Sequence, residues 1–523
     1  MLKEMVVALA VAALALAGTP AYGTSLTANE NVGDGTLTAT PDSVTAQADG
    51  KTYKWSDKNG DGTADDPVNA GLDLAGYSLT RTGDNVGIFL DLNDGTNDGA
   101  ISSTGGLGVI STVRSGGSGP VSIVGATNIA LSAISTHAAG WAPGGAITVT
   151  QSGSFAADDV TSYGIYSTNP SGPITFTGGG SGGGAFSVNN IVASGCQHAT
   201  GGALGGTITI DGYQSVSVGA GGIDAHGARG TYVPTLSITN IGSGGVSVVG
   251  VVTVWDGEGS AKNNLTISTT GPVSVGGLDT HYQGGWSSHD SGDINVTATG
   301  DINVTGTTES RMAGAAGYSK NSGHVNIGSS GGAVTLADVD TSNVSTKAHT
   351  AGNVTVSSRL DLTITGSIDL SMLNQLTTVS RRGELSLSTS ASGGGTIYLG
   401  DETTDVFDLD KVKWAAFDSD SNTDYLGGSL GNFDTTNTGG SGSVVEPFVT
   451  TQTALRCPVG EVIYYGYEAG GLNDYLGGNY YRVADLAGNA GLGGLLAPPK
   501  PVPEPAGLAL LGLALVGLRR RRS

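Results

Sequence analysis

A short alternating pattern of apolar and polar residues recurs through the middle of the chain. Each copy is a Thr, Ser or Asn with one apolar residue on each side. The eight copies are Ile147–Val149, Ile174–Phe176, Ile208–Ile210, Leu236–Ile238, Leu265–Ile267, Ile294–Val296, Val325–Ile327 and Val354–Val356. Successive copies start 27 to 34 residues apart, and most intervals are close to 29. Such alternation is typical of β-strands that bury one face.

Further apolar positions follow each copy at regular distances. A second strand is predicted 8 to 12 residues on, beginning at Phe155, Phe186, Val216, Val246, Val273, Ile302, Val334 and Leu362. A third apolar position comes five residues later in most copies, at Val160, Ile191, Val251, Leu278 and Val339. Three short strands in about 29 residues predict one coil of a parallel β-helix. Two sheets packed as a sandwich would not explain the constant period.

The physics of burial supports the β-helix. One coil cannot bury its apolar side alone, so coils stack about 4.8 Å apart and share a continuous core. Eight copies correspond to about 34 Å of solenoid. Crossover-linked parallel strands are right-handed. We therefore predict an all-β, right-handed parallel β-helix with irregular β caps, plus apolar helices at both ends of the chain.

The chain divides into five predicted segments. Residues 1–23 have a basic start, an apolar run and the small-x-small ending Ala21–Gly23, which is the pattern of a secretory signal peptide. A buried N-terminal helix is the alternative. Residues 24–106 form an irregular β region, residues 107–400 hold the repeats, and residues 401–497, where the period is lost, form a C-terminal β cap. Residues 498–523 hold a Pro-rich spacer and a tail.

Composition and charge narrow the function. Gly accounts for 89 of 523 residues and charged residues for only 13%, which favours strands and turns over charged helices. The net charge of −22 repels phosphate backbones, so we expect no nucleic-acid partner. It suits divalent cations and solubility outside the cell. The two cysteines, Cys196 and Cys457, are too few for a disulfide framework.

One stretch near the N-terminus is similar to a calcium-binding loop. It has oxygen-bearing side chains at alternate positions and a glycine at the sixth position, as in the first half of an EF-hand loop. Val68 stands where an EF-hand has its bidentate glutamate, and no helical pattern flanks the stretch. A hairpin turn rich in Asn-Gly and Asp-Gly is the alternative. The predicted calcium ligands are Asp57, Asn59, Asp61, the Thr63 carbonyl, and Asp65 or Asp66.

The corner between the third strand of one coil and the first strand of the next carries most of the length variation. All seven histidines fall there, as do Trp141, Trp255 and Trp286. Insertions at one corner of a solenoid build one face, often the binding face. Aromatic side chains in a row are suited to stacking on sugars, so these tryptophans are a candidate glycan face. The alternative is that these loops are simply exposed connections.

Two copies of an Asp-x-His pattern occupy equivalent places in the repeat, at Asp224–His226 and Asp279–His281. Stacked directly, such pairs could bind a metal or act in acid–base chemistry. The coil between them carries Val252, Thr253 and Val254 at these positions, and the following coils carry Ser310 and Ser342 level with the histidines. We therefore assign no catalytic residues. Polysaccharide lyases and glycosidases share this architecture, which supports an enzyme by analogy alone.

The C-terminal tail has three parts in a fixed order. The triplet Pro503, Glu504 and Pro505 is followed by the apolar run Ala506–Leu518 and then by an arginine cluster, made of Arg519, Arg520, Arg521 and Arg522. The apolar run is shorter than an ordinary membrane span, and the arginines favour a cytoplasmic C-terminus.

This order resembles the PEP-CTERM sorting signal of exported bacterial proteins. The resemblance implies recognition by a membrane protease of the exosortase type. It also implies transient retention in the inner membrane, followed by release to the cell surface or to an extracellular (biofilm) matrix.

The sequence as a whole predicts an exported, non-enzymatic solenoid that binds glycans or other surfaces, or fills the matrix structurally. A β-helix polysaccharide lyase or glycoside hydrolase is the alternative. Extracellular polysaccharide is the expected partner of either, and calcium is the only cofactor that the sequence suggests.

Overall fold

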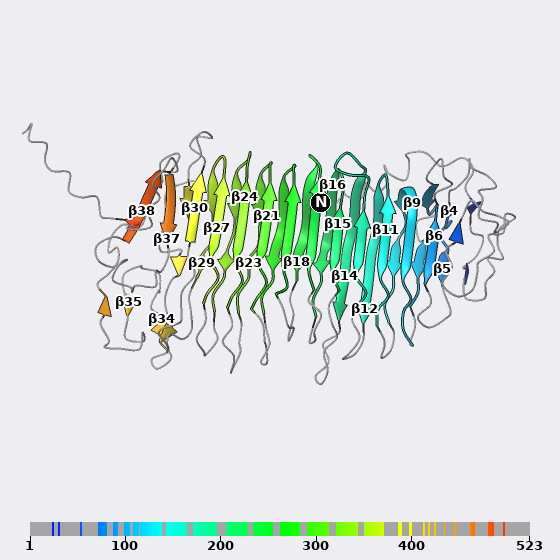
Figure 1. Ribbon diagram of the computed structural model, residues 1–523, viewed down its shortest axis with the longest axis horizontal. Helices are drawn as coiled ribbons and strands as arrows, with labels where there is room; N and C mark the ends of the chain where they lie inside the picture. The colour runs from blue at the N-terminus through cyan, green and yellow to red at the C-terminus, as the bar shows by residue number, and fades with distance from the viewer. Residues whose placement is uncertain are drawn as a thin grey trace, which may run out of the picture.

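The computed structural model describes residues 72–370 apart from short gaps, together with the backbone of isolated strands on either side. The gaps are residues 81–86, 93–98, 105–107, 114–115, 139–142, 165–170, 196–205, 228–233, 255–261, 283–289, 313–320 and 344–349. The described chain forms a right-handed parallel β-solenoid with coils of about 29 residues (Figure 1). The predicted fold class is thus confirmed for the repeats. The predicted terminal helices lie outside the described residues.

Strands stack in three parallel columns. The first column runs through β3 (Tyr53–Lys54), β6 (Ile88–Asp91), the start of β9 (Val121–Ala130), β11 (Ile147–Gln151), β13 (Ile174–Thr177), β15 (Ile208–Asp211), β17 (Leu236–Ile241), β19 (Leu265–Thr269), β21 (Ile294–Ala298), β24 (Val325–Ser329), β27 (Val354–Ser358) and β30 (Leu385–Thr389). All eight predicted first strands lie in this column, and each pairs with the next in register.

The second column contains β1 (Thr24–Ser25), β4 (Leu72–Asp73), β7 (Gly99–Ser102), the end of β9, the starts of β12 (Phe155–Gly164), β14 (Ala185–Gly195), β16 (Ser215–Asp224), β18 (Gly245–Thr253) and β20 (Val273–Asp279), then β22 (Ile302–Val304), β25 (Val334–Leu336), β28 (Leu362–Ile364) and β31 (Ile397–Leu399). The third column contains β2 (Glu30–Asn31), β5 (Ser78–Thr80), β8 (Val109–Ser111), β10 (Ala133–Ser135), the ends of β12, β14, β16, β18 and β20, then β23 (Thr308–Glu309), β26 (Val339–Asp340), β29 (Ile368–Asp369) and β32 (Val412–Lys413).

The parallel ladder already includes β4 to β7, which lie before residue 107, where the sequence predicted that the repeats begin. At the other end, β37 (Glu461–Tyr465) pairs antiparallel with β30 and with β38 (Tyr480–Asp485), which ends the parallel run of the first column. The short strands β33 (Phe417–Asp418), β34 (Thr423–Asp424), β35 (Phe433–Asp434), β36 (Val444–Val445) and β39 (Leu495–Leu496) make local pairs. The segment boundaries themselves stay predictions.

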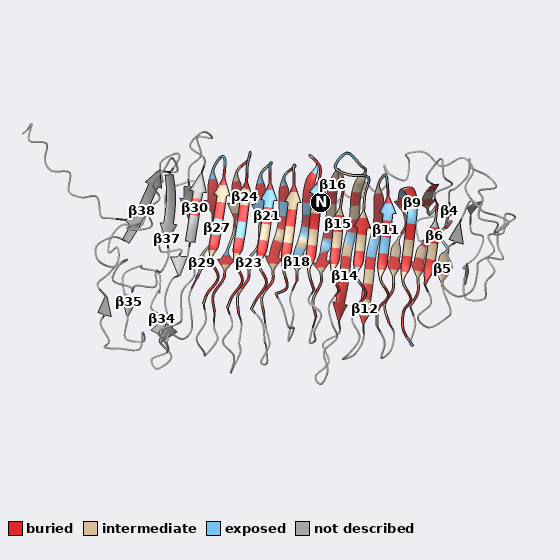
Figure 2. Ribbon diagram, in the orientation of Figure 1, coloured by how far each residue is buried: buried red, intermediate tan, exposed pale blue. Residues whose placement is uncertain are grey.

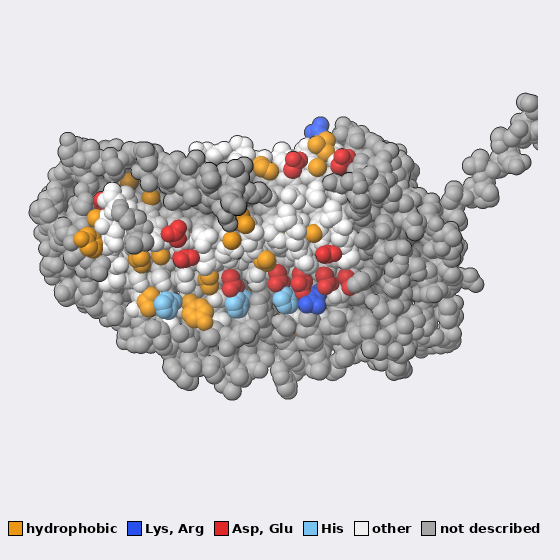
Figure 3. Space-filling view, turned by 180° about the vertical axis from the view of Figure 1, so that it is seen from behind, with side chains coloured by type: hydrophobic (Ala, Val, Ile, Leu, Met, Phe, Trp, Pro, Cys, Tyr) orange, Lys and Arg blue, Asp and Glu red, His pale blue; other side chains and the backbone are white. Residues whose placement is uncertain are grey.

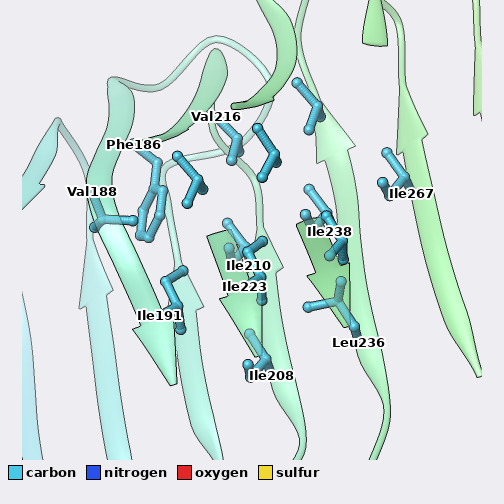
Figure 4. Packing of buried hydrophobic residues seen from close by; sticks show 14 of the residues in the cluster. Phe186, Val188, Ile191, Ile208, Ile210, Val216, Ile223, Leu236, Ile238 and Ile267 are labelled. Atoms are coloured by element: carbon cyan, nitrogen blue, oxygen red, sulfur yellow. The ribbon is translucent and has the colours of Figure 1, made fainter. Parts of the chain in front are cut away.

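The core is a continuous stack of the inward-facing apolar residues (Figures 2 and 4). Strand β11 shows the rule, because Ile147 and Val149 are fully buried while Thr148 and Thr150 are exposed. Neighbouring coils repeat it, so each apolar side chain packs on the equivalent one above and below. No helix among the described residues is long and apolar enough to span a membrane.

Aromatic rings thicken the core in one region of the solenoid. Phe155 and Phe186 come from neighbouring coils and stack with ring centroids 5.2 Å apart, and Phe176 packs against both at 4.7 and 4.9 Å. Tyr213 meets Phe186 edge-on at 5.3 Å. All four rings are fully buried. The Tyr213 hydroxyl has no hydrogen-bond partner among the described residues, and burial raises its pKa.

Candidate functional site

Acidic side chains form a line along the third strand column. In register, Asp224 pairs with Thr253, Thr253 with Asp279, Asp279 with Glu309, Glu309 with Asp340 and Asp340 with Asp369. We call the five acids the acidic row: Asp224, Asp279, Glu309, Asp340 and Asp369. Figure 3 shows acidic and histidine side chains aligned along one face of the solenoid. Outward positions of the first two columns are mostly Thr, Ser and Asn, so negative charge is concentrated on the third.

The residues that follow three of the acids, Asp279, Glu309 and Asp340, anchor the row from inside. Thr280, Ser310 and Thr341 are fully buried, because alternation points them inward between two outward neighbours. Thr280 and Ser310 both donate to the carbonyl of Gly292, at 2.7 and 2.5 Å, and Thr341 donates to Gly352 at 2.7 Å. Each hydroxyl ties the end of a third strand to a turn that precedes a first strand, the next one for Thr280 and Thr341 and that of its own coil for Ser310. The backbone that carries the acidic row is therefore fixed by buried hydrogen bonds.

Two residues beyond three of the acids stands a basic side chain, at His226, His281 and Arg311. Nδ1 of His226 lies 2.5 Å from Oδ1 of Asp224, and Nδ1 of His281 lies 2.5 Å from Oδ1 of Asp279. The repeated Asp-x-His pattern thus forms the same short contact in both places. The two copies are separated by the coil that carries Thr253, as the repeat predicted.

The second copy is part of a larger network. Nδ1 of His281 also lies 3.9 Å from Oε1 of Glu309 in the next coil. Nε of Arg311 donates to the same Glu309 oxygen and lies 3.8 Å from Oδ2 of Asp340. Five charged or titratable side chains from three coils therefore contact one another in sequence along the solenoid axis.

Burial and charge set the pKa values in this network. Burial alone lowers the pKa of His281, but its hydrogen bond to Asp279 and the charges of Asp279 and Glu309 outweigh burial and raise it. By contrast, burial lowers the pKa of His137, whose ring lies 3.3 Å from the Ser135 hydroxyl. Burial, followed by the charge of Asp369, raises the pKa of Asp340 to about 6.

A shallow, open depression with a volume of about 480 Å³ lies beside the acidic row. Its lining combines small, apolar and hydroxyl-bearing residues with three titratable ones: Ala220, Gly221, Ile223, Asp224, His226, Val251, Thr253 and Asp279. The depression lies at the bends between the second and third strand columns, where neighbouring coils differ in length. Four residues separate Val218 from Ile223 in β16, whereas three separate their partners Val248 and Val252 in β18. Gly222 in this turn has a φ of +74°, and a Cβ there would lie 2.3 Å from the carbonyl oxygen of Val251.

This arrangement can accept and donate hydrogen bonds along a line of several coils, attract cations, and hold a proton on one carboxyl beside a charged one. Asp279, His281 and Glu309 also bring one possible metal-ligating atom each to within 4.8 Å of one another. Each of these side chains remains 15 to 20% exposed, so solvent or a ligand can reach it.

Sequence reasoning found part of the site. It identified Asp224, His226, Asp279 and His281, but it did not align Glu309, Asp340 and Asp369 with them. It placed Ser310 level with the histidines, whereas the structure puts Arg311 there, because Tyr282 pairs with Met312. The reason is one extra residue: three residues separate Val304 from Thr308, but only two separate Val275 from Leu278. Ser342 does lie level with Arg311, since Met312 also pairs with Asn343.

Other predicted site residues lie outside the described residues. These are the calcium-type loop (Asp57, Asn59, Asp61, Thr63, Asp65 and Asp66), the three tryptophans (Trp141, Trp255 and Trp286) and the sorting tail (Pro503 to Pro505 and Arg519 to Arg522). The tryptophans belong to segments that join the third strand column to the first. The predicted calcium site and glycan face therefore stay predictions.

The fold and the charged face define an elongated β-solenoid with one acidic side. Comparison with known families adds the cellular route, because residues 501–523 match the PEP-CTERM protein-sorting motif. The resemblance seen in the tail is thus confirmed. The motif implies export, transit through the membrane, surface sorting and processing by an exosortase. No curated protein and no solved structure matches the chain.

Proposed function

We propose that the protein is a non-enzymatic cell-surface or matrix component whose solenoid binds extracellular polysaccharide along the acidic row. The observation that carries the proposal is the row itself, which repeats a polar group in each coil from Asp224 to Asp369. Five steps of about 4.8 Å give a line about 24 Å long. A repeating line of hydrogen-bonding groups suits an extended polymer better than a compact ligand.

Charge selects among polymers. Carboxylates accept strong hydrogen bonds from hydroxyl or ammonium groups, while a polyanion meets like charges along the whole row. The network around Glu309 contains one permanent cation, Arg311, against several acids. We therefore expect neutral or amino-bearing polysaccharides to bind and polyuronates to bind poorly unless a cation bridges them. The depression beside Asp224 and Val251 offers both polar and apolar surface for one sugar unit.

Binding by the exported, processed protein tests the proposal. The double variant Asp224→Asn with Asp279→Asn removes two charges from the row without changing side-chain size. We expect at least about tenfold weaker binding to a neutral or partly deacetylated polysaccharide, equivalent to about 1.4 kcal/mol. The matched control is Asp158→Asn, which changes an exposed acid of β12 outside the row. If the double variant and the control bind the polysaccharide equally well, the acidic row is not part of the binding face.

The predicted aromatic face is tested alongside. Replacing Trp141, Trp255 and Trp286 with Ala should weaken binding of the same polymer if their rings stack on sugars. If these tryptophan variants bind the polymer as the parent does, the tryptophans are not part of the interface and the acidic row alone forms it.

A second candidate function is polysaccharide cleavage. The specific observation in its favour is Asp340, whose pKa of about 6 lets it carry a proton next to the ionised neighbours Asp369 and Glu309. Stacking about 4.8 Å apart places neighbouring carboxyls near the range that glycosidases use. Release of reducing sugar or unsaturated uronate that disappears in Asp340→Asn would favour the enzyme. Absence of both products across a panel of polymers would favour binding alone.

We further propose the steps by which the protein is exported and processed. An N-terminal signal peptide, residues 1–23, would start export, and the apolar run Ala506–Leu518 would hold the protein in the inner membrane with its arginines in the cytoplasm. Cleavage near the Pro-Glu-Pro triplet would then release a body without Ala506–Ser523. Mass spectrometry of exported protein should find no peptide that contains Arg519 to Ser523, and recovery of that terminus would contradict the scheme.

A further inference from the structure

Three side chains of different chemistry converge where two coils of the acidic row meet. Asp279 is the last residue of β20, His281 lies two residues beyond it, and Glu309 comes from β23 in the next coil. One ligand atom from each lies within 4.8 Å of the other two. Nδ1 of His281 is 2.5 Å from Oδ1 of Asp279 and 3.9 Å from Oε1 of Glu309. This is a mixed nitrogen and oxygen donor set, not only a group of acids.

The separations are close to those that a bound metal requires. Bonds from zinc to imidazole nitrogen and carboxylate oxygen are about 2.0–2.2 Å, so tetrahedral ligand atoms lie about 3.4 Å apart. The three atoms must therefore move by at most about 1.4 Å relative to one another. Rotation of the carboxylates can supply this movement. Their backbones need not move, because Thr280 and Ser310, the buried neighbours of the triad, share the Gly292 carbonyl.

An independent feature lies beside the triad. The depression of about 480 Å³ reaches Asp279 and is open to solvent. A metal held by three protein atoms keeps at least one position for water or a ligand, and such a position needs free volume next to it. The triad has that volume on the side of Thr253, which presents a short side chain to the depression.

We propose that Asp279, His281 and Glu309 form a binding site for a single divalent transition-metal ion such as Zn²⁺ or Mn²⁺. Imidazole nitrogen together with carboxylate oxygen suits these ions, whereas calcium and magnesium prefer oxygen ligands throughout. The site is separate from the predicted calcium-type loop at Asp57. It shares Asp279 and Glu309 with the acidic row, but the proposed polysaccharide binding needs no metal.

Arg311 competes with the metal in this arrangement. Its Nε donates to the same Glu309 oxygen that faces His281, so the guanidinium must turn aside before Glu309 can bind an ion. Asp340 provides the alternative partner, with its Oδ2 3.8 Å from Nε of Arg311. Removing this competitor should strengthen metal binding, which is opposite to the effect of removing a ligand.

The chain also contains a natural control. Asp224 and His226 repeat the Asp-x-His contact at 2.5 Å, but the next coil offers Thr253 in place of a carboxylate. With two protein ligands instead of three, the Asp224 pair should bind a transition metal far more weakly. Substituting His226 should therefore leave the tight site intact.

The test is titration of the metal-free, full-length protein with Zn²⁺ and Mn²⁺ by calorimetry, with Ca²⁺ and Mg²⁺ for comparison. We expect one tight equivalent of transition metal that weakens at least about tenfold in His281→Ala and in Glu309→Gln. Binding should be unchanged in His226→Ala and tighter in Arg311→Gln. The melting temperature should rise on metal addition in the parent and much less in Glu309→Gln. This variant is isosteric, so loss of metal binding can be told apart from loss of the fold.

Three results would overturn the proposal. The first is the absence of a tight equivalent in the parent protein. The second is a tight equivalent that survives both His281→Ala and Glu309→Gln, since the metal would then bind elsewhere. The third is stronger binding of Ca²⁺ than of Zn²⁺ or Mn²⁺ at a site that these variants abolish, because an imidazole ligand does not suit calcium.

Discussion

Asp340 should make the solenoid less stable at neutral pH than in mild acid. Its side chain is only 24% exposed, and burial together with the charge of Asp369 raises its pKa from 3.8 to about 6. At a pH between these two pKa values, Asp340 keeps its proton in the folded state but has lost it in the unfolded chain. Stability therefore falls as pH rises from about 4 to about 6 and stays lower above that.

The size of the penalty follows from the shift. A shift of about two units corresponds to about 3 kcal/mol at pH 7 and above, and to almost nothing below pH 4. Asp340→Asn removes the charge but keeps an oxygen that can accept the backbone N–H of Ser342, which donates to Asp340 at 2.9 Å. The lost attraction to Arg311 offsets part of the gain. We expect the variant to be stabilised by about 1–3 kcal/mol at pH 7.5 and to match the parent near pH 4.

Urea unfolding, followed by circular dichroism from pH 4 to pH 8, measures this difference. The control is Asp338→Asn, in the same coil, where the exposed carboxylate accepts hydrogen bonds from the backbone N–H and the hydroxyl of Ser367 at 2.7 and 3.0 Å. It should show no stabilisation that grows with pH. If Asp340→Asn is destabilising at pH 7.5, or if its effect is the same at pH 4 and pH 8, burial of a charge at Asp340 is not a cost to folding.

Three further changes test the core and the calcium prediction. Phe186→Ala should destabilise the protein by about 3–5 kcal/mol in the same unfolding assay, because Phe186 touches three buried rings, whereas Ser187→Ala on the outward face should change stability little. Tyr213→Phe should stabilise the protein by about 1 kcal/mol, since it removes a buried hydroxyl without a described partner, and a loss of stability would reveal a hydrogen bond to that hydroxyl. Calcium chelation should lower the melting temperature if the predicted Asp57 loop binds calcium, and Asp61→Asn should abolish the difference; an unmoved melting temperature would make the loop a turn.

The sequence by itself determined the coil. A strict alternation such as Ile147-Thr148-Val149 admits only one burial pattern, and its recurrence about every 29 residues admits only a stack of coils in which equal positions meet. For this reason the eight central strands of the first column, from β11 to β27, were predictable together with their pairing. The Asp-x-His pairs at Asp224 and Asp279 were also predictable, because the two side chains of each pair are only two residues apart and depend on local geometry alone.

Only the tertiary structure decided which charged side chains became neighbours. One added residue between Val304 and Thr308 moves Glu309 level with Asp279 and places Arg311 level with His281. Turns tolerate such additions without disturbing the apolar core, so hydrophobic periodicity carries no signal of them. A one-residue shift nevertheless exchanges inward and outward side chains along the strand that follows. The acidic row, the raised pKa of Asp340 and the metal-binding triad therefore follow from turn lengths, while the solenoid that holds them follows from the repeat.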